Sequence, residues 1–218
     1  MPEYRPQPRL PQQQPAAWPQ PRQPARRRRS KKIRNWLLLL FILMLTASLL
    51  VNRNDELARK LPFVRKDAPP VVQLHPIVEA KKDELIAEAA KLGISILITD
   101  DFRSNQEQDS LYAQGRTSDG SIVTHARGGE SYHNYGLAID FALKTKQDEV
   151  VWDMEYDGNG NGQADWMEVV EIAKRLGFSW GGDWERFKDY PHLQMDFGYS
   201  IEELQRGYRP PDVLLEHE

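Results

Sequence analysis

The sequence predicts an α+β domain, a small antiparallel sheet with helices packed on it, preceded by one transmembrane helix. Three observations support this prediction. Residues 36–51 form an apolar run without a charge, and residues 76–92 repeat apolar side chains at helical spacing before a glycine. Two later segments, 137–141 and 192–197, alternate apolar and polar residues, which is the period of a half-buried strand.

Composition and charge exclude several classes of protein. The chain has 218 residues with 29 Lys and Arg, 32 Asp and Glu, and no cysteine, so it can build neither a disulfide scaffold nor a Cys-ligated zinc site. The length favours one domain plus extensions. Residues 1–34 carry a formal charge of +9 and the remainder carries −12. We therefore expect no nucleic-acid partner for the acidic part of the chain.

The N-terminal part reads as a tail followed by an anchor. Residues 1–34 are expected to be a disordered, proline-rich, basic cytoplasmic tail, because they offer few apolar side chains to bury. Residues 35–52 are expected to be a transmembrane signal anchor, since the apolar run and its flanks just reach the length that spans a bilayer. The basic cluster before the run predicts a cytoplasmic N-terminus and an extracytoplasmic domain, in a single-pass protein of a bacterial cell membrane.

Two alternatives apply to this region. A cleaved signal peptide could use the small residues 46–48, although a leader of about 35 residues is long for a secretory signal. A cytoplasmic partner could bind the proline-rich tail, although a passive tether is the simpler interpretation.

The remaining elements follow from capping and breaking residues. Residues 53–75, with three prolines and mixed charge, are expected to be a linker to a domain over 76–218. Pro76 is typical of a helix start. Residues 94–99 are rich in β-branched side chains, which predicts a strand. Capping boxes predict helices over about 104–114 and near the C-terminus; they pair Ser104 with Glu107 and Ser200 with Glu203.

The two alternating segments carry the chemistry. Asp140 alternates with apolar residues in the first, and His192 does so in the second. If both strands turn their apolar faces to one core, these two side chains emerge on a common polar face, and His133, just before the first strand, can close a three-ligand site. Two imidazoles and a carboxylate leave a fourth tetrahedral position open, as in catalytic zinc sites. Manganese or iron would suit the same ligands, and polar-core histidines without a metal are the alternative.

Two spaced motifs extend this interpretation. Ser131-x-His133-x-x-Gly136-x-Ala138-x-Asp140 and the later Asp189-x-x-His192 resemble the signatures of the LAS-type zinc peptidases. That family includes D-Ala-D-Ala carboxypeptidases and dipeptidases, and the bacterial and phage L-alanyl-D-glutamate endopeptidases, which the chain resembles most. The resemblance covers about residues 76–197. It implies a LAS/hedgehog-like zinc peptidase fold, with His133, Asp140 and His192 as zinc ligands.

The resemblance also implies two catalytic residues. Asp189 would be the catalytic carboxylate, taking a proton from water and delivering it to the leaving amine. Arg103 matches an arginine of the family and would stabilise the oxyanion that forms when water attacks the peptide carbonyl. The alternatives are a solvated loop acid for Asp189 and an ion-pair partner of Asp100 or Asp101 for Arg103.

A second metal site is predicted over residues 157–168. This segment fits the EF-hand loop pattern, and the segment before it, residues 149–153, is expected to be a strand and not a helix. We therefore expect an EF-hand-like calcium loop without the first helix. The oxygen ligands would be Asp157, Asn159, Asn161, Gln163, Asp165 and Glu168. The alternative is a connection rich in Asn and Gly whose oxygens face water.

These inferences lead to one expected function. The chain should be a membrane-anchored zinc peptidase that hydrolyses peptidoglycan stem peptides, with L-Ala–D-Glu as the expected bond, in cell-wall turnover. One alternative keeps the zinc chemistry in a D-Ala-D-Ala carboxypeptidase or dipeptidase. The other is a non-catalytic wall-binding module that keeps a metal for structure.

Overall fold

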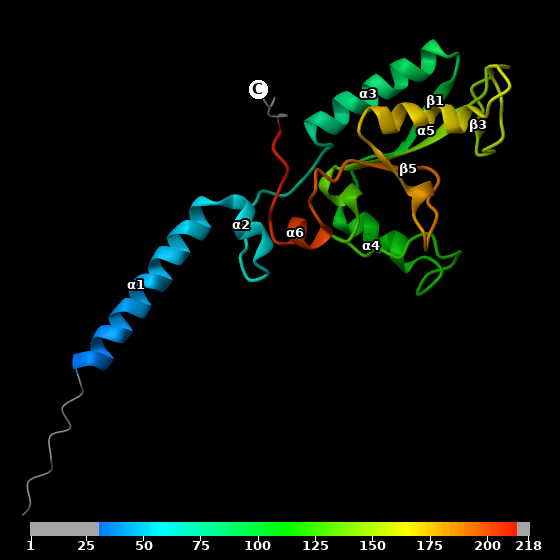
Figure 1. Ribbon diagram of the computed structural model, residues 1–218. Coiled ribbons are helices and arrows are strands. Elements are labelled where there is room, and N and C mark those ends of the chain that lie inside the picture. Colours follow the sequence, from blue (N-terminus) through cyan, green and yellow to red (C-terminus); the bar gives the residue numbers. More distant parts are fainter. Residues whose placement is uncertain (1–30, 213–218) are drawn as a thin grey trace, which may run out of the picture. The chain divides into compact units, whose positions relative to one another are not determined.

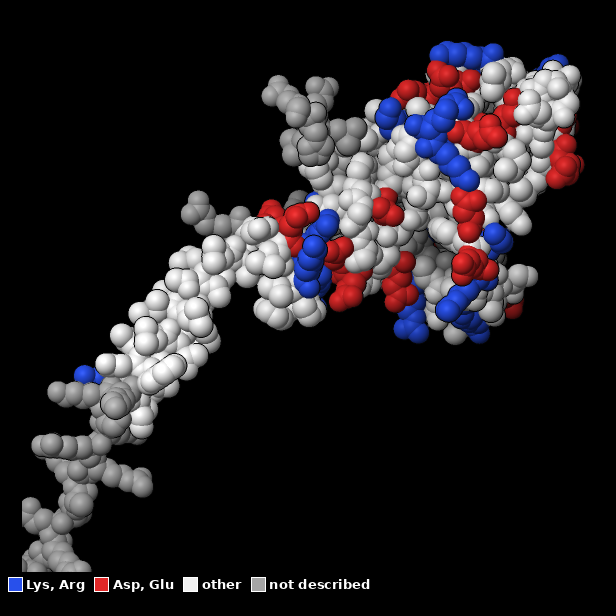
Figure 2. All heavy atoms as spheres, viewed as in Figure 1, with Lys and Arg blue, Asp and Glu red and all other residues white. Residues whose placement is uncertain are grey.

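The computed structural model describes residues 31–212, and the expected tail lies outside this range except for its last four residues. The chain divides after Arg53 into two compact units, each described by itself. The first contains α1, Lys31–Arg53, whose residues 33–51 are long and apolar enough to cross a membrane by length and composition. Residues 33–50 are all exposed, and Figure 2 shows α1 as an almost uncharged surface. A membrane anchor and a signal sequence both fit these properties.

The second unit is built around a small antiparallel sheet, as predicted (Figure 1). Its path is β1-β2-β5-β4, and β3 pairs with the far end of β2. The strands are β1 Ser95–Asp100, β2 Ala138–Lys144, β3 Val150–Val151, β4 Ser179–Trp180 and β5 His192–Gln194. β2 is hydrogen-bonded on both sides, and its apolar residues have almost no exposed surface.

Two helices cover one face of this sheet. They are α3, Pro76–Lys91, and α5, Asp165–Arg175, which contact each other as well as β1 and β4. Leu85 and Ala89 on α3, and Val169 and Ile172 on α5, recur three or four residues apart and are buried. They pack on the alternating apolar residues of the strands, which include Ile139, Phe141 and Leu193. The core therefore lies between the helices and this face, and leaves the polar face of the sheet for the site.

The capping boxes predict two helix starts correctly. Ser104 and Glu107 cap α4, Asn105–Ala113, and Ser200 and Glu203 cap α6, Ile201–Gln205. The second alternating segment forms a shorter strand than predicted. β5 ends at Gln194, and the chain then turns through Phe197 and Gly198, which both have positive φ.

Residues 54–66, within the expected linker, are held on the domain. They include a short helix, α2 Asp55–Lys60, with Asn54 as its N-cap. The buried Arg206, just after α6, donates hydrogen bonds to the carbonyl oxygens of Arg59, Leu61 and Val64. A Cβ on Gly207 would lie 2.0 Å from the Lys66 carbonyl oxygen, so only glycine permits this close approach.

Candidate active site

Three strands bring one row of side chains to the polar face of the sheet. Asp140 on β2 is directly opposite Asp100 on β1 and His192 on β5. Directly opposed residues in antiparallel strands point to the same face. The predicted common face of Asp140 and His192 is therefore confirmed, and the strand pairing accounts for it.

His133 reaches the row from a 3₁₀ helix, Tyr132–Tyr135, that precedes β2. Ser131 caps this helix by accepting the backbone N–H of His133. Gly136 ends it in the left-handed conformation, with φ of 66°, and a Cβ there would lie 2.3 Å from the Gln73 carbonyl oxygen. The serine and glycine of the first motif thus set the turn that aims His133 at Asp140.

The three candidate ligand atoms form a nearly equilateral triangle. His133 Nε2 lies 3.2 Å from His192 Nδ1, and each of these nitrogens lies 3.3 Å from Asp140 Oδ1. Tetrahedral ligands about 2.0–2.1 Å from zinc are about 3.3 Å apart. Within residues 31–212, this is the one group of three or more His, Cys, Asp or Glu that could hold a metal ion.

The donor chemistry of the triangle also suits a cation. His133 Nδ1 lies 2.6 Å from the carbonyl oxygen of Asp101. A carbonyl only accepts hydrogen bonds, so Nδ1 carries the proton and Nε2 presents a lone pair to the triangle. Asp140 Oδ1 is buried and accepts no hydrogen bond from the described residues. Buried electron pairs facing one another are costly without a positive charge between them.

Charge coupling within the triangle shifts two pKa values in opposite directions. Burial alone would raise the pKa of Asp140, but His133 and His192 lower it well below the usual range. Burial alone would lower the pKa of His192, but the Asp140 carboxylate raises it above the ordinary 6.5. In the metal-free site, His192 therefore keeps its proton, which offsets the Asp140 charge, to higher pH than an ordinary imidazole does.

Asp189 lines the same pocket from the turn that leads into β5. The backbone N–H of His192 donates to the Asp189 carbonyl, and the backbone N–H of Asp189 donates to the Gly181 carbonyl. A Cβ on Gly181 would lie 2.3 Å from the Asp189 carbonyl oxygen, so the turn rests directly on this glycine. Burial and the charge of Asp140 raise the pKa of the Asp189 carboxyl, which makes it a stronger base.

Arg103 is held between two aspartates and a buried amide. It forms an ion pair with Asp100, and its Nη2 lies 3.9 Å from Asp140 Oδ2. Nη1 donates to Gln108 Oε1 at 2.8 Å. Gln108 is fully buried, and its amide nitrogen donates to the Ala126 carbonyl in the pocket wall. The ion pair with Asp100, which was the alternative role for Arg103, is therefore present. Arg103 lines the pocket as well.

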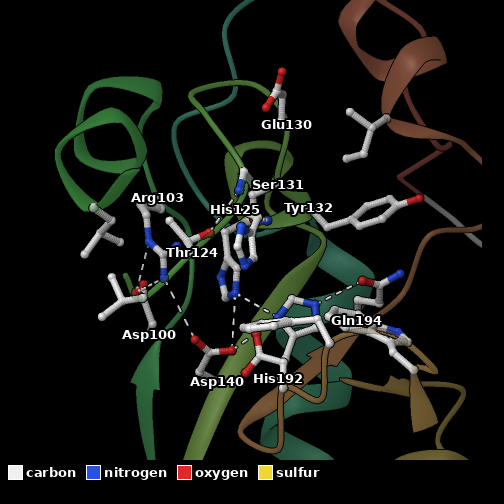
Figure 3. A pocket seen from close by; sticks show the side chains of 18 residues that line it. Asp100, Arg103, Thr124, His125, Glu130, Ser131, Tyr132, Asp140, His192 and Gln194 are labelled. Carbon is white, nitrogen blue, oxygen red and sulfur yellow. Dashed lines mark hydrogen bonds and ion pairs between the residues drawn. The ribbon is translucent and has the colours of Figure 1, made fainter. Parts of the chain in front are cut away.

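The pocket over this site has a volume of about 680 Å³. Arg103, Asp140 and His192 line it together (Figure 3). His133 and Asp189 also line it. Its walls also include the apolar side chains Leu111, Val123, Trp184, Phe187 and Ile201. Volumes of this order are typical of ligand-binding pockets.

The predicted calcium ligands lie in the connection between β3 and α5 and in the first turn of α5. Asp157 accepts the backbone N–H groups of Gly160, Asn161 and Gly162, which wraps the loop around its carboxylate. The side-chain amides of Asn159 and Asn161 donate to the Glu168 carboxylate. The carboxylates of the loop do not converge as closely as the three ligand atoms of the His133 group, within the described residues.

Comparison with known proteins gives consistent matches. Residues 124–195 match the model of a family described as D-alanyl-D-alanine carboxypeptidase. The chain is 67% identical over 130 residues to the peptidoglycan L-alanyl-D-glutamate endopeptidase CwlK of Bacillus subtilis (strain 168), an alignment that covers 60% of this chain and 78% of that protein. It is 34% identical over 116 residues to the L-alanyl-D-glutamate peptidase of Listeria phage A118, covering 53% of this chain and 36% of the phage protein. The crystal structure of the Serratia marcescens L-Ala D-Glu endopeptidase ChiX aligns at 19% identity and a TM-score of 0.33, over 58% of this chain and 91% of that chain.

Proposed function

The chain belongs to the LAS-type zinc peptidase family, and from this membership we propose that it hydrolyses the L-Ala–D-Glu bond of peptidoglycan stem peptides. The observation that carries the proposal is the 67% identity over 130 residues to an endopeptidase named for that bond. The pocket supports it, because three candidate ligands, a half-buried carboxylate and an arginine line one cavity. Cell-wall turnover would be the process served.

His133, Asp140 and His192 would hold the zinc ion, with His133 bound through Nε2, His192 through Nδ1 and Asp140 through Oδ1. Zinc in such a site supplies Lewis acidity, which polarises a carbonyl and makes water acidic enough to lose a proton near neutral pH. The two buried imidazoles contribute no charge when neutral, so Asp140 is the ligand that offsets part of the positive charge.

Asp189 would act as general base and then as general acid. A carboxylate oxygen takes a proton from the water molecule as the water oxygen bonds to the peptide carbonyl carbon. The same carboxyl returns this proton to the amide nitrogen as the carbon–nitrogen bond breaks, which releases a carboxylate and an amine. Its raised pKa favours both steps, because the carboxyl gives and takes the proton more evenly near neutral pH.

Arg103 would stabilise the negative charge that develops on the carbonyl oxygen. Its ion pair with Asp100 and its hydrogen bond to Gln108 fix the guanidinium before substrate arrives. A fixed positive group is more effective than a mobile one, because little reorganisation is needed in the transition state.

We propose further that α1 anchors the enzyme in a bacterial membrane as a single span. The basic residues before α1 favour a cytoplasmic N-terminus, with the peptidase domain outside the membrane, where peptidoglycan is found. The proline-rich tail would then be the part available to a cytoplasmic partner.

The test uses the full-length protein in detergent, loaded with zinc and incubated with purified peptidoglycan. Mass spectrometry of the products should find new D-Glu amino termini, with L-Ala left on the glycan side. Release of D-Ala instead would reassign the enzyme to the carboxypeptidase class. Binding to peptidoglycan without any cleavage, with zinc content confirmed, would indicate a wall-binding module.

We also propose that residues 157–168 bind calcium. Asp165 is 3% exposed, and its Oδ1 has no hydrogen-bond partner among the described residues. Burial raises the pKa of this carboxyl, and the nearby charges of Glu168 and Asp157 raise it further. Three acidic groups that repel one another in this way would be relieved by a hard cation with oxygen ligands.

Calcium binding is tested by thermal unfolding of the zinc-loaded, calcium-free protein. Added calcium should raise Tm, because an ion that binds only the folded state stabilises it. Glu168→Gln should remove this rise. The matched variant Glu171→Gln, at an exposed position one turn further along α5, should keep it. An equal calcium response in all three proteins would refute binding by the loop.

A further inference from the structure

We propose that Gln194 is a positioning residue that determines which ring nitrogen His192 offers to the metal. This inference rests on the proposed metal centre and extends it to a residue outside the ligand set. The Oε1 atom of Gln194 lies 3.0 Å from Nε2 of His192. Both side chains are nearly buried, with exposed fractions of 8% and 5%.

The strand geometry places the two side chains together. Gln194 follows His192 by two residues on β5, so both point to the same face of the sheet. Gln194 is paired with Ala138 on β2 and with Ser179 on β4, and both of these partners have small side chains. Figure 3 shows the amide oxygen of Gln194 directed at the far edge of the His192 ring, away from Asp140.

The hydrogen bond fixes the proton of a neutral imidazole. An amide oxygen only accepts, so the contact requires the proton on His192 Nε2. The lone pair is then on Nδ1, which is the nitrogen 3.3 Å from Asp140 Oδ1 and 3.2 Å from His133 Nε2. With the other tautomer, a proton would point into the triangle and oppose a cation there.

The two imidazoles are thus supported differently. His133 depends on the main-chain carbonyl of Asp101, which no substitution removes. His192 depends on a side chain, so Gln194 is the position at which the sequence can change this support. The ring of Trp184, with its centroid 5.1 Å from that of His192, contacts the ring but offers its N–H only as a donor. It cannot replace the amide oxygen.

Two substitutions separate the hydrogen bond from packing. Gln194→Leu keeps much of the volume and removes the acceptor, whereas Gln194→Glu keeps an acceptor in a similar shape. Loss of a partner that orients a metal-bound histidine weakens metal binding by roughly 10–100-fold. We therefore expect the zinc dissociation constant, measured by chelator competition, to rise by roughly this factor in Gln194→Leu. In Gln194→Glu it should stay equal to that of the unchanged protein or fall.

Two further readouts make the test decisive. The melting temperature of each metal-free variant reports folding, and long-range ¹H–¹⁵N correlation spectra of the zinc-loaded proteins report which ring nitrogen of His192 keeps its proton. The unchanged protein and Gln194→Glu should show the Nε2–H form, and Gln194→Leu should show a mixture.

Unaltered zinc affinity in a folded Gln194→Leu variant would overturn the proposal. Equal loss in both variants would also overturn it, because packing rather than the acceptor would then be responsible. Peptidase activity is not needed for either result, so failure here is distinguishable from failure of the proposed function.

Discussion

Asp140 and His192 are direct neighbours across β2 and β5, and Asp140 Oδ1 lies 3.3 Å from His192 Nδ1. Such pairing gives the site a rigid base, because both Cα positions belong to a buried ladder of the sheet. The same contact also makes two cations, a proton and a metal ion, compete for this pair of side chains. Without a metal, a proton on His192 satisfies the carboxylate, and a metal must displace this proton to bind.

Zinc affinity should therefore depend on pH in a defined direction. The pKa of His192 is raised, so the proton is held at pH values where a free imidazole would already be neutral. Above this raised pKa the affinity should be constant. As the pH falls below it, the affinity should decrease by up to about tenfold per pH unit, since one proton is displaced. Chelator competition between about pH 5 and 9 measures this, and a flat profile through 6.5 would contradict the coupling.

Asp189→Asn should separate catalysis from metal binding. The amide cannot take a proton, so we expect kcat to fall by roughly 10²–10⁴-fold. Zinc content should be unchanged, because Asp189 is outside the group of three ligand atoms. Asp183→Asn is the matched control, since Asp183 is in the same connection but pairs with Lys174 near the surface. Loss of zinc from Asp189→Asn would indicate a ligand role instead of a proton-transfer role.

The sequence predicted those parts of the site that follow from local periodicity. Strand alternation was sufficient to put Asp140 and His192 on one face, and the two capping boxes located α4 and α6. His133 was correctly grouped with them, although its 3₁₀ helix was not predicted. Four-residue turns of this kind have no period that a sequence pattern can reveal.

The residues that support the site were harder to predict. Gln108 is 16 and 18 residues from its two partners in the pocket wall, and it lies on a different element from them. A buried glutamine on a helix has no sequence signature. Gln194 had a weak signal, because it alternates in step with His192. The contacts of Arg206 with residues 59–64 span more than 140 positions, so only the tertiary fold brings them together.

Gly181→Ala should weaken the metal centre through the backbone. The added Cβ would lie 2.3 Å from the Asp189 carbonyl oxygen and 3.1 Å from His192 Cβ, so the turn that joins these two residues must move. We expect lower zinc affinity together with lower activity.

Gly198→Ala is a useful comparison, because its Cβ meets nothing within 4 Å although its φ is positive. That variant should lose about 1 kcal/mol of stability from backbone strain and keep its zinc affinity. Equal zinc affinity in both variants would show that the turn tolerates the displacement.

Arg206→Ala should loosen residues 54–66 from the domain. The guanidinium donates to three carbonyls in this stretch, and hydrogen bonds from charged groups contribute about 1.5–3 kcal/mol each when they are buried. Some of this is regained when water solvates the freed carbonyls, so we expect unfolding free energy to fall by roughly 2–4 kcal/mol. Limited proteolysis should then cut between residues 54 and 66 faster than in the unchanged protein.

Arg65→Ala, at an exposed position of the same stretch, is the control and should behave like the unchanged protein. Equal cleavage rates in all three proteins would mean that the salt bridge of Arg59 with Glu203, and not Arg206, holds the stretch in place.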